Sequence, residues 1–493
     1  MENYASISPH VLIFPLPAQG HIKPMLNLAE LFCRADIRVT FLITTQIHQR
    51  LIQYTDTDAR FGRYTGFRFR VMPDEPPAQQ FYNQDHLKEW LDDMVQGLAV
   101  NAKPVLEEML CGYADTSVES SSSSGVMCLV ADGWLSFAYD VANEAGVPVI
   151  SFRCPSACCV WGYFCTPRLV EAGEVPFQDE DLDKLVENVP GMGTFLRYRD
   201  LPSFCRTKDK HACLGIEQAF ASEIERTKNA YGLILNTFED LEGPILSLLR
   251  SQCKRVYSIG PLHALLQNRL TQETTTLNNR SSSLWEADQS CLSWLDKKPV
   301  KSVVYVGFGS LTVLERDQIT EIWEGLVQSK KYFLWVIRPD LITSNDDGYQ
   351  TSEAILQGTK DRGCIVSWAP QEAVLAHRAI GGFLTHSGWN STIESITAGV
   401  PMICWPYFAD QQINSRYVGE VWRIGLDMKD MCDRNVVTEM VNDLLDGKKD
   451  EVERSMGRMS DAAKRSVTEG GSSCRNLDSL IEDIKMMSLN GEH

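Results

Sequence analysis

The chain has 493 residues, of which 44% are hydrophobic and 23% are charged, and its formal net charge is −18. This length and composition are typical of a globular protein with two or three domains. The acidic balance argues against nucleic-acid binding, because a negative surface repels phosphate backbones.

The first half of the chain alternates short apolar runs, rich in β-branched and aromatic residues, with helical patterns. The runs predict strands at 10–14, 37–43, 67–71, 126–131 and 147–151, with helices at 25–32, 87–110 and 136–145. This β-α alternation predicts a parallel sheet with helices on both faces.

The pattern loosens between residues 154 and 228, where aromatic residues, prolines and cysteines are frequent, as in a pocket wall or a lid. Regular runs return at 233–236 and 256–259. The polar segment 267–283 contains a run of Thr and Ser and predicts a linker between domains.

A second series begins at Ser302 and predicts strands at 302–306, 332–337, 364–367, 382–384 and 402–405, followed by a last helix at 474–487. We therefore expect an α/β fold with two facing, doubly wound, Rossmann-like domains and ligands in the cleft between them. The predicted parts are an N-terminal acceptor-binding domain (1–262), a linker (263–288), a C-terminal donor-binding domain (289–470) and a helix that packs back toward the N-terminal domain (471–493).

The densest motif of polar and aromatic residues spans Trp368 to Gln411 and includes the turn Thr385-His386-Ser387-Gly388-Trp389-Asn390-Ser391. This turn follows a predicted strand and opens a helix near Asn390. The free N–H groups and positive dipole end of such a helix form an anion site, which suits a diphosphate in a chain of low basic charge. Glu394 can accept hydrogen bonds from a ribose diol, and Trp368 offers a flat face to a nucleobase.

The segment Trp368–Gln411 closely resembles the plant secondary-product signature of the family-1 UDP-glycosyltransferases, and the likeness extends over nearly the whole chain. The resemblance implies the GT-B fold and an inverting transfer of a sugar from a UDP-sugar, without a metal or another cofactor. It is strongest for the branch that glucosylates terpenoids and iridoids. Ser387 stands where relatives usually have Cys.

The resemblance also implies the donor contacts. Trp368 stacks on uracil, and Ala369 contacts its edge through backbone atoms. The remaining roles are ribose binding by Gln371 and Glu394, phosphate binding by Ser310, His386, Asn390 and Ser391 around Gly388, and sugar binding by Trp389, Asp410 and Gln411. A final Gln together with Trp389 favours glucose as the sugar.

His21 is the candidate general base, because it lies between a strand and a helix at the edge that faces the cleft. A neutral imidazole can take a proton from an acceptor hydroxyl as that oxygen attacks the anomeric carbon. Asp132 ends a predicted neighbouring strand and can orient this imidazole. The family likewise has a His and an Asp at these places.

Two Asp-x-Asp sequences, at 56–58 and 181–183, match the pattern of metal-dependent glycosyltransferases, but neither follows a clear buried strand. We therefore predict no metal. Fifteen cysteines without a Cys-x-x-Cys pair favour reduced thiols over disulfides or zinc. No window approaches the roughly 18 apolar residues that span a bilayer. We expect a cytoplasmic monomer whose partners are a UDP-sugar and a small acceptor.

The acceptor pocket is predicted around Tyr82, Trp134, 154–164 and 197–204, and the acceptor is expected to be a small apolar terpenoid or iridoid with a hydroxyl or a carboxyl group. Two alternatives stay open: a UDP-sugar epimerase, and a non-catalytic protein that binds a nucleotide sugar or a terpenoid. A dehydrogenase is disfavoured, because no Gly-x-Gly-x-x-Gly follows the first strand.

Overall fold

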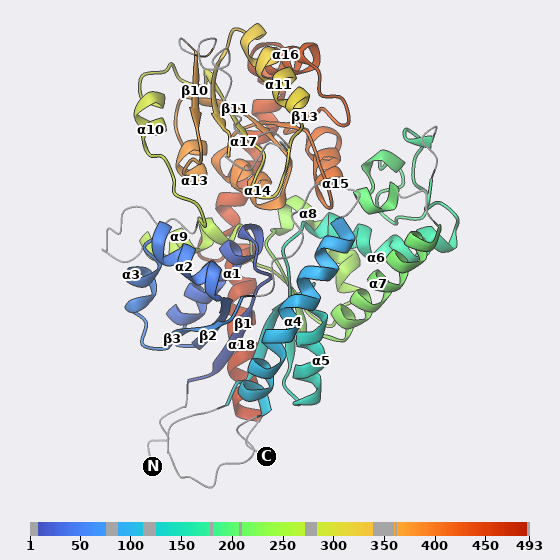
Figure 1. Ribbon diagram of the computed structural model, residues 1–493, viewed down its shortest axis with the longest axis vertical. Helices are drawn as coiled ribbons and strands as arrows, with labels where there is room; N and C mark the ends of the chain where they lie inside the picture. The colour runs from blue at the N-terminus through green and yellow to red at the C-terminus, as the bar shows by residue number, and fades with distance from the viewer. Residues whose placement is uncertain are drawn as a thin grey trace.

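The computed structural model describes residues 8–74, 87–111, 125–177, 181–206, 210–271, 283–338, 359 and 362–490. Within these ranges the chain forms two parallel sheets, each flanked by helices, and Figure 1 shows the two domains stacked along the long axis. Tyr82 lies outside the described residues.

The N-terminal sheet has seven strands in the order β3-β2-β1-β4-β5-β6-β7, all paired in parallel. Its strands are β1 (His10–Phe14), β2 (Arg38–Thr44), β3 (Phe67–Met72), β4 (Cys128–Asp132), β5 (Val149–Arg153), β6 (Gly232–Leu235) and β7 (Val256–Ser258). Its helices are α1 (Gln19–Arg34), α2 (Thr45–Tyr54), α3 (Thr57–Gly62), α4 (Leu87–Cys111), α5 (Ser136–Glu144), α6 (Ala157–Glu171), α7 (Lys210–Asn229), α8 (Glu239–Arg250) and α9 (Leu262–Thr271), with short turns η3 (Tyr198–Asp200) and η4 (Ser203–Arg206).

The C-terminal sheet has six parallel strands in the order β10-β9-β8-β11-β12-β13. Its strands are β8 (Val303–Gly307), β9 (Tyr332–Val336), β10 (Gly363–Val366), β11 (Ile380–Thr385), β12 (Met402–Cys404) and β13 (Gly425–Asp427). Its helices are α10 (Ser290–Leu295), α11 (Arg316–Gln328), α13 (Gln371–Leu375), α14 (Trp389–Ala398), α15 (Gln411–Arg416), η5 (Tyr417–Val421), α16 (Arg434–Asn442), η6 (Asp443–Gly447) and α17 (Lys449–Ser466).

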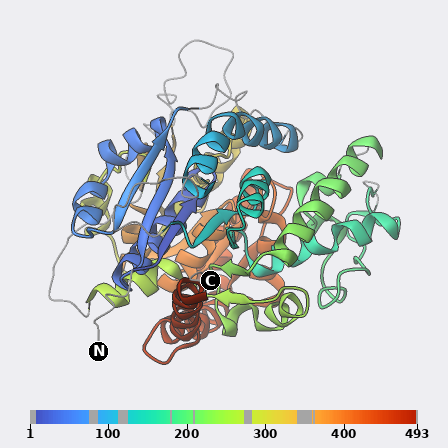
Figure 2. The same ribbon diagram turned by 90° about the horizontal axis from the view of Figure 1, so that it is seen from below.

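The last helix, α18 (Ser472–Asn490), leaves the second domain and packs against β7 of the first. Tyr257 in β7 donates a hydrogen bond to Asp483 in α18. Figure 2 shows this helix beside the N-terminal domain. The C-terminal end of the chain thus returns to the N-terminal domain.

The segment at 154–228 is more regular than its sequence indicates, because it contains the helices α6 and α7. Helix α6 is buried on almost every side, including Cys158, Trp161 and Tyr163. A helix surrounded by protein has no polar face, so its sequence lacks the 3.6-residue alternation by which helices are found.

The predicted linker also begins with a helix. Helix α9 packs on α1 through apolar side chains, and Leu265, Leu266 and Leu270 are buried. The first residues of the predicted linker 267–283 thus belong to helix α9, which packs on the N-terminal domain.

Candidate active site

The His21 and Asp132 side chains meet at the carboxyl ends of two neighbouring strands. His21 lies in the first turn of α1, which follows β1 after a short loop, and Asp132 is the last residue of β4. Because β1 and β4 pair in parallel, these two ends share one edge of the sheet. His21 Nδ1 lies 2.5 Å from Asp132 Oδ2.

The electrostatics of this pair favour an ionised Asp132 that orients a histidine. Burial alone would raise the pKa of Asp132, but His21 and the hydrogen bond from the Trp134 N–H outweigh it and lower this pKa. Asp132 is 1% exposed and the His21 side chain 19%. The imidazole therefore has one edge on the carboxylate and the other toward the cavity.

The anion site predicted in the C-terminal domain lies at the N-terminus of helix α14. This helix begins at Trp389 and has Gly388 as its N-cap. The helix thus starts slightly earlier than the capping residue types Asn390 and Ser391 suggest. Its first intrahelical bond joins the Thr392 N–H to the Gly388 carbonyl. The N–H groups of residues 389–391 precede this bond and have no partner within the helix.

Gly309 and Gly388 leave room for His386, which lies between them. A Cβ atom at either position would approach His386 Nε2 to 2.5 Å, and Gly309 has a φ of +71°. Burial and the nearby Arg338 lower the pKa of His386 to about 4, so its imidazole is neutral at neutral pH. A neutral ring can offer one N–H to a phosphate without adding charge.

Replacing Gly309 with alanine is expected to weaken UDP binding by about tenfold or more. The alanine would strain the backbone and displace His386 in the donor site, at a cost of roughly 1–3 kcal/mol. Gly62→Ala is the matched control, since a Cβ there meets nothing within 4 Å. Calorimetric titration with UDP measures both variants. Wild-type affinity in Gly309→Ala would contradict this role for the glycine.

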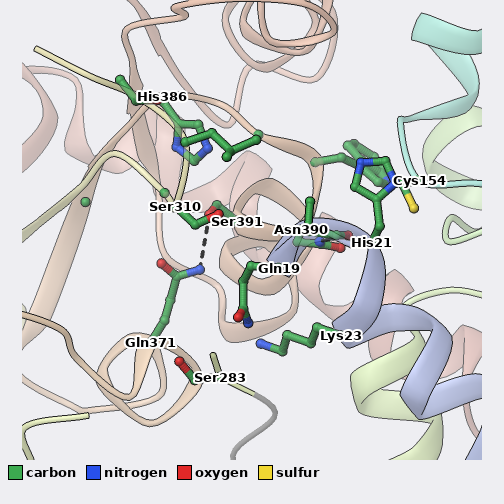
Figure 3. A pocket seen from close by; sticks show the side chains of 18 of the residues that line it. Gln19, His21, Lys23, Cys154, Ser283, Ser310, Gln371, His386, Asn390 and Ser391 are labelled. Carbon is green, nitrogen blue, oxygen red and sulfur yellow. Dashed lines mark hydrogen bonds between the residues drawn. The ribbon is translucent and has the colours of Figure 1, made fainter. Parts of the chain in front are cut away.

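The ribose-binding candidates form a hydrogen-bonded group across the domain boundary. Gln371 Nε2 donates to Ser391 Oγ at 3.1 Å and to Glu394 Oε2 at 2.9 Å, and Figure 3 shows the first of these bonds. Lys23 of helix α1 lies 2.7 Å from Glu394 and 2.5 Å from Glu372. Burial would lower the pKa of Lys23, but the two carboxylates outweigh it and raise this pKa.

Sequence reasoning missed Lys23, because a lysine in an N-terminal helix gives no sign of a partner 371 residues away. A second contact also joins the domains, since Asn390 Nδ2 donates to the carbonyl of Gly20 at 2.7 Å. The Asn390 side chain thus holds the first turn of α1, which carries His21, while its backbone N–H stays at the start of α14.

The predicted base-stacking residue Trp368 lines the cavity and is supported by a second indole. Trp285 stacks on it, with ring centroids 5.7 Å apart and planes at 24°. The guanidinium groups of Arg50 and Arg338 lie 5.3 and 5.7 Å from the Trp285 ring. Trp285 lies at the end of the predicted linker, where no local pattern marks it as part of a site.

The predicted sugar-binding residues lie around α14 and α15. Trp389 is almost fully buried, and its indole N–H donates to the carbonyl of Asn236 at 2.9 Å. Gln411 Oε1 accepts the backbone N–H groups of Tyr407 and Phe408, which leaves its amide nitrogen for a ligand. Asn414 donates to Asp410 at 2.8 Å.

One cavity of about 990 Å³ contains the predicted site residues of both domains except Asp132, which lies just behind His21. The predicted residues that line it are His21, Ser310, Trp368, Ala369, Gln371, His386, Gly388, Trp389, Asn390, Ser391, Glu394, Asp410 and Gln411. Figure 3 shows side chains from both domains facing the same space. The arrangement can hold an anion at α14 and a proton acceptor at His21 in one enclosure.

The other end of the cavity is apolar. Its lining includes Leu16, Trp90, Leu91, Trp134, Pro155, Tyr163, Phe204, Phe220 and Phe408. Parts of the predicted acceptor stretches 154–164 and 197–204 therefore face the cavity. Arg197 lies elsewhere, because its guanidinium pairs with Asp200 at 3.0 Å.

Comparisons with known proteins agree with this geometry. Residues 286–458 match the family model described as UDP-glucoronosyl and UDP-glucosyl transferase. The chain is 49% identical to 7-deoxyloganetic acid glucosyltransferase of Catharanthus roseus over 98% of both chains. It is 40% identical to 7-deoxyloganetin glucosyltransferase of the same plant over 97% of both.

Solved structures show the same fold. The structure of Phytolacca americana UGT2 complexed with UDP-2fluoro-glucose and pterostilbene superposes with a TM-score of 0.75 at 26% identity, covering 98% of this chain and 100% of that one. The structure of Medicago truncatula UGT71G1 complexed with UDP-glucose superposes with a TM-score of 0.75 at 27% identity. The match covers 97% of this chain and 98% of that one.

The fold is GT-B, with two facing Rossmann-like domains and a cleft between them. The chain belongs to the family of UDP-glucuronosyl and UDP-glucosyl transferases, and it is a UDP-glycosyltransferase enzyme. The predictions of fold, family and enzyme class are confirmed. The alternatives of an epimerase and of a binding protein find no support in these comparisons.

Among the described residues, no helix combines the length and the apolar character that crossing a membrane requires.

Proposed function

We propose that this enzyme transfers glucose from UDP-glucose to a hydroxyl or carboxyl group of a small apolar terpenoid or iridoid, with inversion to a β-glucoside. The supporting observation is the single cavity that joins the His21–Asp132 pair to the N-terminus of α14. The named relatives that act on 7-deoxyloganetic acid and 7-deoxyloganetin support the choice of acceptor class.

In this proposal the donor's diphosphate lies at the start of α14, near Ser310 and His386, and its uracil lies on Trp368. Backbone N–H groups and the helix dipole stabilise the leaving UDP, so no metal is required. Lys23 supplies positive charge between Glu372 and Glu394, which would otherwise repel the diphosphate. Gln371 and Lys23 hold Glu394 in place for the ribose diol.

The acceptor lies against the apolar wall, with its nucleophilic oxygen at His21. His21 takes the hydroxyl proton as the oxygen attacks the anomeric carbon from the face opposite UDP. Asp132 holds the ring and stabilises the imidazolium that forms. We also propose that the enzyme is a monomer and that it is cytoplasmic; free cysteines, as found in the described residues, are typical of that reducing compartment.

The test is incubation with UDP-glucose and single acceptors, namely 7-deoxyloganetic acid, 7-deoxyloganetin and a flavonoid, read by mass spectrometry. A glucoside of at least one of the first two supports the proposal. Products from the flavonoid alone would overturn the acceptor class. UDP-glucose converted to an epimer without any acceptor would overturn the reaction.

Asp410 gives the proposal a pH dependence. Burial raises the pKa of Asp410 to about 6, so this carboxyl is ionised above that pH and protonated below it. An ionised carboxylate accepts sugar hydroxyls better than a protonated one. The affinity for UDP-glucose is therefore expected to fall several-fold from pH 7 to pH 5.

Calorimetric titration with UDP-glucose at each pH measures this affinity. Asp410→Asn is the control, because an amide does not titrate in this range, and its affinity for UDP-glucose is expected to change less with pH. An equal pH dependence in the wild type and in Asp410→Asn would contradict the assignment of Asp410 to the sugar.

A further inference from the structure

Beside the catalytic pair lies a third side chain, Cys154, which directly follows β5. Its Sγ lies 3.6 Å from Asp132 Oδ2 and lines the same cavity as His21. Figure 3 shows Cys154 next to His21 at one side of the cavity. Nothing in the proposed transfer of glucose uses this thiol.

The three side chains form a cluster of potential metal ligands. One ligand atom from each of His21, Asp132 and Cys154 lies within 4.8 Å of the others, and within the described part of the chain this is the one such group of His, Cys, Asp and Glu. Imidazole nitrogen, carboxylate oxygen and thiolate sulfur are the ligands of protein-bound zinc.

We propose that His21, Asp132 and Cys154 form an inhibitory site for Zn²⁺, in which the ion binds the catalytic pair itself. The site has three protein ligands and an open fourth position toward the cavity, which is the pattern of zinc sites that keep a water or a ligand exchangeable. The ion is not a cofactor here, because it occupies the groups that the proton transfer needs.

The distances suit a tetrahedral ion after a small adjustment. Zinc bond lengths of about 2.0–2.3 Å place neighbouring ligand atoms about 3.3–3.6 Å apart. The Asp132 Oδ2 to Cys154 Sγ distance of 3.6 Å already meets this value. The His21 Nδ1 to Asp132 Oδ2 distance of 2.5 Å has to widen, which a rotation of the partly exposed imidazole can supply.

Binding also changes protons in a defined way. A zinc ion deprotonates a coordinating thiol, and this proton leaves to solvent. The imidazole binds zinc through Nδ1, and the proton that Nδ1 shared with Asp132 moves to Nε2.

The consequence for catalysis follows from this tautomer. An imidazole whose Nδ1 binds zinc and whose Nε2 carries a proton has no lone pair left to accept the proton of an acceptor hydroxyl. Removing the ion with a chelator restores the hydrogen bond to Asp132. The inhibition part of the inference rests on the proposed function, whereas the metal site itself does not.

The first test compares zinc inhibition of the wild type with that of Cys154→Ala, each normalised to its own rate without zinc. Loss of a ligand is expected to raise the half-inhibiting zinc concentration by about tenfold or more. Cys111→Ala is the matched control for an exposed thiol and is expected to respond like the wild type. EDTA is expected to restore the wild-type rate. Equal sensitivity of Cys154→Ala and the wild type would overturn the inference.

The second test needs no activity, so it separates the metal site from the proposed reaction. Co²⁺ added to the full chain is expected to give a thiolate-to-cobalt charge-transfer absorption that Cys154→Ser lacks and Zn²⁺ displaces. Release of one proton per zinc ion is expected by calorimetry in buffers of different ionisation enthalpy. The same absorption with unchanged affinity in His21→Asn, or none in the wild type, would overturn the site.

Discussion

Replacing His21 with alanine is expected to lower the rate of glucosyl transfer to a hydroxyl acceptor by about 10²- to 10⁴-fold, which is the usual worth of general base catalysis. The loss falls on the chemical step, because His21 is bonded to Asp132 of the N-terminal domain, whereas the proposed diphosphate site lies at the start of α14 in the C-terminal domain. The rate with saturating UDP-glucose, together with UDP affinity by calorimetry, measures the effect.

Two features make this prediction specific. UDP affinity is expected to stay within a few-fold of the wild type, since the start of α14 is intact. A carboxyl acceptor is already ionised near neutral pH and needs no base, so its glucosylation is expected to tolerate the substitution better than that of a hydroxyl. Full turnover of an alcohol acceptor by His21→Ala would refute the role of His21 as general base.

Replacing Glu394 with glutamine is expected to weaken UDP-glucose binding by about 10- to 150-fold, because hydrogen bonds to a charged group contribute roughly 1.5–3 kcal/mol. Glu394 holds both Lys23 and Gln371 and is 5% exposed. A neutral amide accepts hydrogen bonds from Lys23, Gln371 and the ribose diol less well than a carboxylate does. Its NH₂ group is also a donor, so it cannot accept from any of these groups. The KM for UDP-glucose and the UDP affinity measure the loss.

Glu372→Gln is the matched control, because Glu372 also pairs with Lys23 but its side chain is 45% exposed. Its effect on UDP-glucose binding is expected to be smaller, since an exposed ion pair contributes little. If both variants weakened binding equally, the loss would belong to the Lys23 ion pair, and Glu394 would not be the ribose acceptor.

The sequence predicts the sheets of this fold well, because parallel strands buried on both faces are continuous apolar runs. The runs at 10–14 and 332–337 match β1 and β9 nearly residue for residue. The three-residue strand β13 is too short to give such a run. Helix α6 was not predicted, because its burial on almost every side removes the alternation of apolar and polar residues by which helices are recognised.

The candidate site shows a similar division. Residues within one turn, such as His386 to Ser391, are predictable together because a strand-to-helix turn brings them to one place. The meeting of His21 and Asp132 is predictable from the carboxyl ends of neighbouring strands. The contacts of Lys23 with Glu394 and of Asn390 with Gly20 depend on how the two domains face each other, and no local pattern encodes that.

In the proposed enzyme, the start of α14 and the residues around it form a UDP site within reach of His21. Calorimetric titration of the wild type with UDP, in a buffer without added metal, measures this site. Saturable binding of one UDP per chain is expected. No detectable binding of UDP would rule out a UDP site at the start of α14.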